Sequence, residues 1–160
     1  MNSPLIVFGA NYLIILIIGI AVAYFIKQPR KKQGSILIFS LLSLFLIYLT
    51  IKIIGYFYFD PRPFVVNHFT PLIPHAPDNG FPSDHMLVSS AVAAMLYYYN
   101  RKISAVLWVL AFIVGASRVV AGVHHWSDIA GSALIAIIIA FIINRYLKLS
   151  FSRFAPDSAE

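Results

Sequence analysis

Long apolar stretches alternate with short polar stretches along the chain, and this pattern predicts a membrane protein. The five apolar runs cover residues 4–26, 35–59, 83–100, 103–119 and 127–147. A helix needs about 20 apolar residues to cross the hydrocarbon core of a bilayer. The third and fourth runs are short for that task and are equally compatible with buried helices. We therefore expect an all-α, polytopic membrane helical bundle with about five transmembrane helices.

Composition agrees with this pattern. Hydrophobic residues make up 60% of the chain and charged residues 11%, and the mean hydropathy is +0.83. Soluble domains carry about 25% charged residues. The chain is expected to form a single integral-membrane domain over residues 1–160, with its first apolar run retained as a span. Because the chain has no cysteine, disulfides and thiolate chemistry are excluded.

The positive charge has two possible explanations. A formal net charge of +6 and a pI near 9.7 would suit a nucleic-acid-binding protein. However, nine of the twelve lysines and arginines flank the apolar runs, at Lys27, Arg30, Lys31, Lys32, Arg101, Lys102, Arg145, Lys148 and Arg153. Basic residues of this kind prefer the cytoplasmic side of a membrane. We therefore expect no nucleic-acid partner, and we expect residues 60–84 and 118–126 to face outward.

The three remaining basic residues are Arg62, Arg118 and Lys52. Arg62 and Arg118 carry planar guanidinium groups that donate two parallel hydrogen bonds to phosphate oxygens. Lys52 is a charged residue inside an apolar run, which is costly and usually functional. Residues 82–85 open a helix, whose free amide groups and dipole favour an anion. Together these features predict an anion-binding site.

Histidines and an aspartate near this site suggest catalysis. His124 and Asp128 are four residues apart, so on a helix they would share a face, and the carboxylate would hold one imidazole nitrogen. This is the relation of a nucleophile to the group that orients it. His85 has the chemistry of a general acid. His125 does not fit the spacing and is interpreted as a lining residue, and His75 as an ordinary loop residue.

These segments resemble the three signature motifs of the type 2 phosphatidic acid phosphatase superfamily. The third motif, Ser-Arg-x5-His-x3-Asp, is matched in full by residues 117–128. The second is Pro-Ser-Gly-His in the family and reads Pro-Ser-Asp-His at residues 82–85. The first, Lys-x6-Arg-Pro, is matched by Arg-Pro at residues 62–63. Its lysine is not matched, because Gly55 stands at that position and Lys52 comes three residues early.

The resemblance implies a membrane lipid phosphatase with a phosphohistidine intermediate. His124 would attack the terminal phosphorus, Asp128 would orient it, and His85 would protonate the leaving group. The residues implied to hold the phosphate are Arg62, Arg118, Ser83, Asp84 and Lys52. Ser83 and Asp84 are also expected to cap the helix that they open. The Pro-Ser-Asp-His form further resembles the bacterial subgroup that hydrolyses undecaprenyl pyrophosphate, the bacitracin-resistance type.

Two other functions remain open at this point. One is a phosphatidate or phosphatidylglycerophosphate phosphatase, and the other is a non-catalytic lipid-phosphate carrier, which needs the arginines but no histidine–aspartate pair. No metal or other cofactor is expected, because Arg62 and Arg118 would repel a divalent cation from the same pocket. The expected partners are a polyprenyl pyrophosphate and the bilayer of the cell membrane, with the active site facing outside. The sequence leaves the oligomeric state open.

Overall fold

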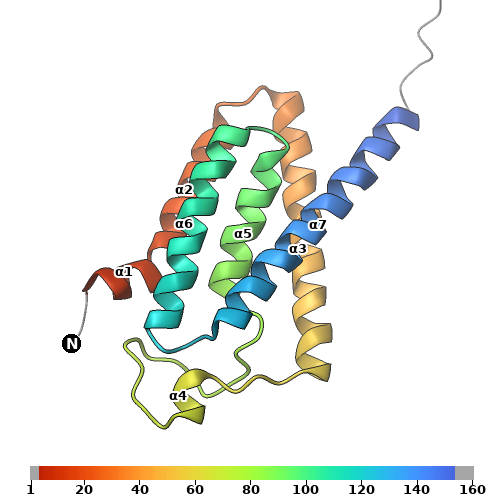
Figure 1. The fold of residues 1–160 in the computed structure, drawn as a ribbon. Helices are drawn as coiled ribbons and strands as arrows, with labels where there is room; N and C mark the ends of the chain where they lie inside the picture. Colours follow the sequence, from red (N-terminus) through yellow and green to blue (C-terminus); the bar gives the residue numbers. More distant parts are fainter. Residues whose placement is uncertain (1–3, 154–160) are drawn as a thin grey trace, which may run out of the picture.

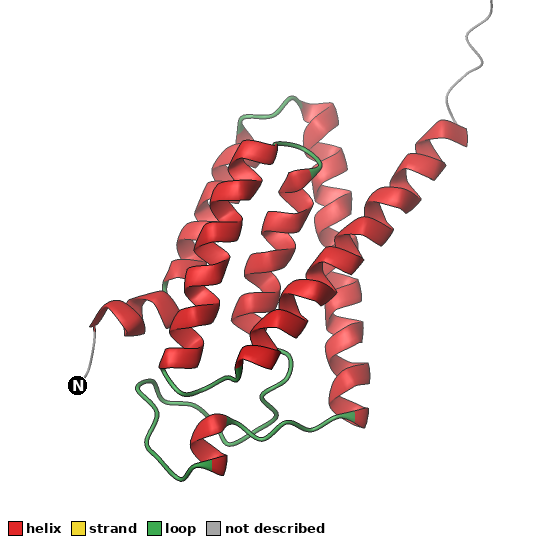
Figure 2. Ribbon diagram, in the orientation of Figure 1, coloured by secondary structure: helices red, strands yellow, loops and turns green. Residues whose placement is uncertain are grey.

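The computed structural model describes residues 4–153, and the described chain is a bundle of helices without strands (Figure 2). Its helices are α1 Pro4–Asn11, α2 Leu13–Ile26, α3 Arg30–Phe57, α4 Pro63–Val66, α5 Asp84–Tyr97, α6 Arg101–Val120 and α7 Trp126–Arg153. Figure 1 shows α2, α3, α5 and α6 running side by side, with α7 crossing them obliquely. The predicted all-α bundle is confirmed.

The lengths of the helices and their outer surfaces fit a bilayer. Three helices, α3, α6 and residues 126–147 of α7, are long and apolar enough to cross a membrane. The bent pair α1 and α2 makes a fourth if it counts as one span. Large apolar side chains such as Leu41, Phe45 and Leu49 point outward from α3. Because lipid tails solvate such side chains as well as a protein core does, the chain is a multi-pass membrane protein.

The third predicted span, α5, is the central helix of the bundle. Its 14 residues measure about 21 Å at 1.5 Å per residue, less than the roughly 30 Å of a hydrocarbon core. It packs against α2, α3, α6 and α7. Small buried residues, including Ser89, Ser90 and Ala93, let these neighbours approach closely. The predicted count of five is therefore roughly right, with one member enclosed by the others.

Helix boundaries differ from the prediction where local hydrogen bonds decide them. The first apolar run is two helices, bent by 46° at Tyr12. The basic pair at residues 101–102, predicted to lie between two helices, belongs to the first helical turn of α6. Asn100 starts this helix, because its side-chain oxygen accepts the N–H groups of Lys102 and Ile103 at 3.1 Å each. Such an N-cap satisfies donors that the helix itself leaves free.

The polar loops gather at one end of the bundle. Residues 58–83, which include α4, lie at the same end as residues 121–125 (Figure 1). The connection at residues 27–29 and the turn at residues 98–100 lie at the opposite end. The basic flanks and the motif-bearing loops are thus separated along the bundle, as their alternation in the sequence predicts.

Gly122 sets the direction of the loop between α6 and α7. Its φ of +80° is a left-handed conformation that side chains rarely adopt. A Cβ atom at this position would also collide with the aromatic ring of Phe69. The next N–H, from Val123, donates back to the carbonyl of Arg118 at 3.2 Å. This turn aims the residues that follow it into the end of the bundle.

Replacing Gly122 by alanine should therefore destabilise the protein. We expect a lower Tm in detergent, because the left-handed backbone costs a side-chain-bearing residue about 1–2 kcal/mol and the Phe69 ring must also move. Gly34→Ala is the matched control, since nothing lies within 4 Å of a Cβ added at that helical position. Equal Tm values for the two variants would contradict this account of the turn.

Candidate active site

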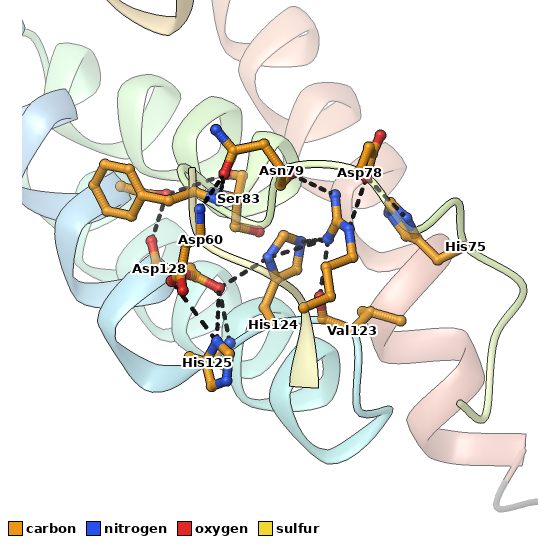
Figure 3. A network of polar contacts seen from close by, with 12 residues as sticks. Asp60, His75, Asp78, Asn79, Ser83, Val123, His124, His125 and Asp128 are labelled. Carbon is orange, nitrogen blue, oxygen red and sulfur yellow. Dashed lines mark hydrogen bonds and ion pairs between the residues drawn. The ribbon is translucent and has the colours of Figure 1, made fainter. Parts of the chain in front are cut away.

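Arg62 is held in one orientation by two loops. The side chain is buried just before α4, although the chain around it is a loop. Its Nε donates to Asp78 Oδ1 at 2.8 Å and its Nη2 donates to the Asn79 carbonyl at 3.0 Å. Its Nη1 donates to the Val123 carbonyl at 2.9 Å (Figure 3). Every nitrogen of the guanidinium group therefore has a fixed partner, and the pKa of Asp78, which burial alone would raise, is lowered by Arg62.

The same guanidinium group contacts the imidazole of His124. Arg62 Nη1 lies 3.3 Å from His124 Nε2 and 3.5 Å from Nδ1. On its other side, His124 Nδ1 lies 3.3 Å from Asp128 Oδ2. A proton on Nδ1 satisfies this contact and leaves Nε2 unprotonated, where its lone pair accepts from Arg62 Nη1. Burial lowers the pKa of His124 despite the opposing hydrogen bond to Asp128, and Arg62 and Arg118 lower it further, so the ring is neutral near pH 7.

Asp128 reaches His124 by a different route from the one that the spacing suggested. His124 lies in the loop before α7, so the two residues do not share a helix face. Asp128 is in the first turn of α7 and folds back toward the preceding loop, where its Oδ2 accepts the His125 N–H at 2.7 Å. An acid that caps its own helix in this way is the reciprocal half of a capping box. The pair was predicted correctly and its local geometry was not.

Ser132 ties this helix to the start of α5. Its hydroxyl donates to the Asp128 carbonyl at 2.6 Å and accepts the Ser83 N–H at 2.9 Å. The Ser83 hydroxyl makes no capping hydrogen bond, so the expected capping role of this side chain is wrong. Asp84 is exposed in the first turn of α5, where its charge suits the helix dipole.

Two buried donors near the site have no partner among the described residues. Arg118 is buried near the end of α6, where Nη1 donates to the Ala10 carbonyl at 3.4 Å and Nε is unpaired. The Ser83 hydroxyl is fully buried and also unpaired. His85, one turn into α5, lies within electrostatic range of Arg118 and His124. Unpaired buried donors are costly, by about 1–3 kcal/mol each, so this arrangement favours an anion.

Lys52 lies beside the site, with its ammonium group near the ring of Tyr48. It lines a cavity of about 440 Å³ that Arg62, Asn79 and Asp84 also line. Its Nζ lies 5.6 Å from the centre of the Tyr48 ring, in a cation–π contact on α3. Because α3 ends at Phe57, the backbone leaves the helical path before Arg62.

The structure adds residues that the sequence did not single out. Asp78 and Asn79 come from the loop at residues 58–83, and both hold Arg62. The His75 ring, interpreted as part of an ordinary loop, stands edge-on to the His124 ring with 6.1 Å between centroids. Burial lowers the pKa of His75, and so do Arg62 and Arg118. These contacts join residues 16 to 49 positions apart in the sequence, and no local pattern predicts them.

The sequence matches a known protein family over most of its length. Residues 36–152 match the PAP2 superfamily. The chain belongs to this superfamily. It is 42% identical over 92 residues to the undecaprenyl-diphosphatase BcrC of Bacillus subtilis (strain 168), a match that covers 58% of this chain but only 48% of that protein. It is 30% identical over 153 residues to the bacitracin transport permease protein BcrC of Bacillus licheniformis, covering 94% of this chain and 75% of that protein.

The fold has a close counterpart among solved structures. The crystal structure of Aquifex aeolicus LpxE matches with a TM-score of 0.67 and 28% sequence identity. The match covers 89% of this chain and 82% of that structure. The expected resemblance to the type 2 phosphatases, and to their bacitracin-resistance branch in particular, is confirmed.

Replacing Asp128 by asparagine should lower the pKa of His124 still further. The carboxylate raises this pKa through its hydrogen bond and its charge, so removing the charge leaves burial and the two arginines unopposed. Titration of selectively labelled histidines by NMR in detergent would measure the shift. Resonances of the exposed His68 should be the same in both proteins. An unchanged or raised His124 pKa would show that the contact in the structure is not an electrostatic one.

Proposed function

We propose that this protein is a membrane lipid phosphatase that hydrolyses undecaprenyl pyrophosphate to the monophosphate through a phosphohistidine on His124. The observation that carries the proposal is the contact of 3.3 Å between Arg62 Nη1 and His124 Nε2. It puts a cation next to the positions that the oxygens of a phosphoryl group would take when its phosphorus bonds to Nε2. The similarity to the Bacillus undecaprenyl-diphosphatase and bacitracin transport permease proteins supports the choice of lipid.

The reaction has two steps. In the first, His124 Nε2 forms a bond to the terminal phosphorus in line with the bridging oxygen, and the phosphorus–oxygen bond breaks. The electron pair of the broken bond stays on the bridging oxygen, which leaves with the lipid monophosphate, and His85 donates a proton to that oxygen. Asp128 stabilises the positive imidazole ring that forms. In the second step, His85 takes a proton from water as the water oxygen bonds to the phosphorus of the phosphohistidine. The phosphorus–nitrogen bond breaks, its electron pair returns to His124 Nε2, and inorganic phosphate leaves.

Electrostatic stabilisation supplies most of the catalysis of phosphoryl transfer. Arg62 is already fixed by its loop contacts, so it needs no reorganisation during the reaction. The unpaired Nε of Arg118 and the hydroxyl of Ser83 are donors for the equatorial oxygens. The backbone N–H of Asp84 at the start of α5 is a further donor. Lys52 would reach the phosphate by leaving Tyr48 and crossing the cavity that it lines.

A second cavity supports a lipid substrate. It lies between α3 and α5, has a volume of about 120 Å³, and is lined mainly by apolar side chains, among them Leu44, Ile47, Val88 and Met95. The polar cavity beside Lys52 is bounded by later residues of α3 and by the start of α5. The two cavities therefore follow one another along the same pair of helices. A headgroup in the polar cavity would leave its hydrocarbon tail beside the apolar one.

The orientation in the membrane follows from the distribution of charge. The basic flanks at the end opposite the site would face the cytoplasm under the positive-inside rule. The site would then face outside, at the surface of the cell membrane. A phosphatidate or phosphatidylglycerophosphate phosphatase would use the same residues, so the rates with the different lipids distinguish the three activities.

Purified protein in detergent with EDTA should release inorganic phosphate from undecaprenyl pyrophosphate faster than from phosphatidate or phosphatidylglycerophosphate.

His124→Ala should lower the rate of phosphate release from undecaprenyl pyrophosphate more than about a thousandfold, because the nucleophile is lost. His125→Ala is the matched control, since it keeps the backbone N–H that binds Asp128, and it should retain a substantial part of the activity. Equal losses in two folded variants would refute the nucleophile. Binding without any turnover by the wild type would favour the carrier.

Lys52→Met should reduce turnover about tenfold to a hundredfold, the usual range for losing one hydrogen bond to a charged group. Expression should stay intact, because the substitution removes a charge from an apolar helix. Lys31→Met, at the opposite end of the bundle, is the control and should behave as the wild type does. A fully active Lys52→Met enzyme would show that the two arginines hold the phosphate without this lysine.

A further inference from the structure

A second carboxyl group, from Asp60, lies against the Asp128 carboxylate. The backbone of Asp60 is fixed on both sides, since its N–H donates to Asn79 Oδ1 at 2.9 Å and its carbonyl accepts the Gly80 N–H at 2.8 Å. Gly80 allows this close approach. A Cβ atom there would lie 3.1 Å from the Asp60 carbonyl oxygen and 3.4 Å from Asp128 Oδ2. The loop thus carries Asp60 to the group that orients His124.

The two carboxyl groups form a compact cluster with His125. Ligating atoms of Asp60, His125 and Asp128 all lie within 4.8 Å of one another (Figure 3). His125 Nδ1 is 3.7 Å from Asp60 Oδ2 and 3.9 Å from Asp128 Oδ2, too far for a hydrogen bond to either. Two carboxylates at such close range repel each other when both are ionised. A proton or a cation between them removes that repulsion.

One oxygen of Asp128 lacks a donor. The Asp128 side chain is completely buried, and its Oδ2 is used by the His125 N–H and the His124 ring. Its Oδ1 has no N–H or hydroxyl partner in the described part of the chain. A buried carboxylate oxygen without a donor is unfavourable. The carboxyl group of Asp60, once protonated, is the donor that the cluster offers.

We propose that Asp60 is a positioning residue that carries a proton and donates it to the free oxygen of Asp128, which fixes the carboxylate that orients His124. This inference rests on the phosphatase function proposed above. An O–H···O⁻ bond of this kind is short and strong. It also leaves the pair with a single negative charge, available to the imidazole of His124.

The electrostatics of Asp60 agree with this assignment. Burial raises the pKa of Asp60, and the hydrogen bond and the charge of Asp128 raise it further, while His125 opposes the change. Asp128 and His125 are the titratable groups that face it. Below the raised pKa the proton is present and Asp128 is held. As the pH rises through that pKa the proton is lost, so the positioning effect belongs to the acidic side of the activity profile.

A divalent cation bound by the same three side chains is the competing explanation. Asp60→Asn separates the two, because an amide N–H donates to Asp128 at every pH but an amide is a poor substitute for a carboxylate ligand. Asp60→Ala removes both the donor and the ligand. The comparison of these variants with the wild type is therefore decisive.

The experiment measures the pH dependence of kcat and KM for phosphate release from undecaprenyl pyrophosphate by the three folded proteins. We expect Asp60→Asn to stay within about threefold of the wild-type kcat below the raised pKa of Asp60 and to lose the decline that the wild type shows as Asp60 ionises. Asp60→Ala should lose about tenfold or more in kcat with little change in KM, because Asp60 does not touch the substrate. Equal inactivation of both variants, or full activity of both, would overturn the proposal.

A second measurement needs no turnover. Infrared spectroscopy over a pH titration should detect the C=O stretch of a carboxyl group in the wild type that stays protonated above the usual pKa of aspartate, and this band should be missing in Asp60→Asn. Its absence from the wild type would refute the proton on Asp60. An inactive wild type that still shows the band would instead refute the phosphatase function, so the two failures are distinguishable.

Discussion

The buried carboxylate of Asp128 is the group on which the rest of the site depends. A charge that lies wholly inside a membrane bundle is tolerable only when donors surround it. Here the His125 N–H and the His124 ring provide them, and both come from the loop just before α7. The left-handed turn at Gly122 sets the direction of that loop. The absence of a side chain at Gly80 leaves room for the loop at residues 58–83 to pack next to Asp128. Backbone geometry in two loops thus stabilises one charge.

The short central helix explains how such a polar site exists in an apolar bundle. Because α5 has only 14 residues, its first turn is set back from the ends of its longer neighbours. The loop at residues 58–83 occupies the space that this leaves, and it carries its own hydrogen-bond partners for Arg62. The polar groups therefore cluster at the end of the bundle, away from the middle of the hydrocarbon, where charge costs most.

The sequence predicted what depends on local patterns. Apolar runs located the helices, and the spacing of His124 and Asp128 identified a true pair. The sequence did not predict the bend at Tyr12, where α1 turns away to pack against α6. It also did not predict the hydrogen bond from Arg62 to Asp78, because these residues are 16 positions apart. The orientation of the Lys52 side chain was not predicted either, because its ammonium group can lie over the Tyr48 ring or extend into the cavity that the residue lines.

The two arginines differ in how their charge is balanced, and this suggests different tasks. Arg62 has a carboxylate partner, Asp78, at 2.8 Å, so its guanidinium group is paired and oriented before any ligand arrives. Arg118 forms no ion pair with the described residues and donates only to the Ala10 carbonyl. A buried, uncompensated cation raises the affinity of a site for an anion, whereas a preorganised one fixes its geometry. We infer that Arg118 supplies most of the attraction for phosphate and Arg62 most of the alignment with His124.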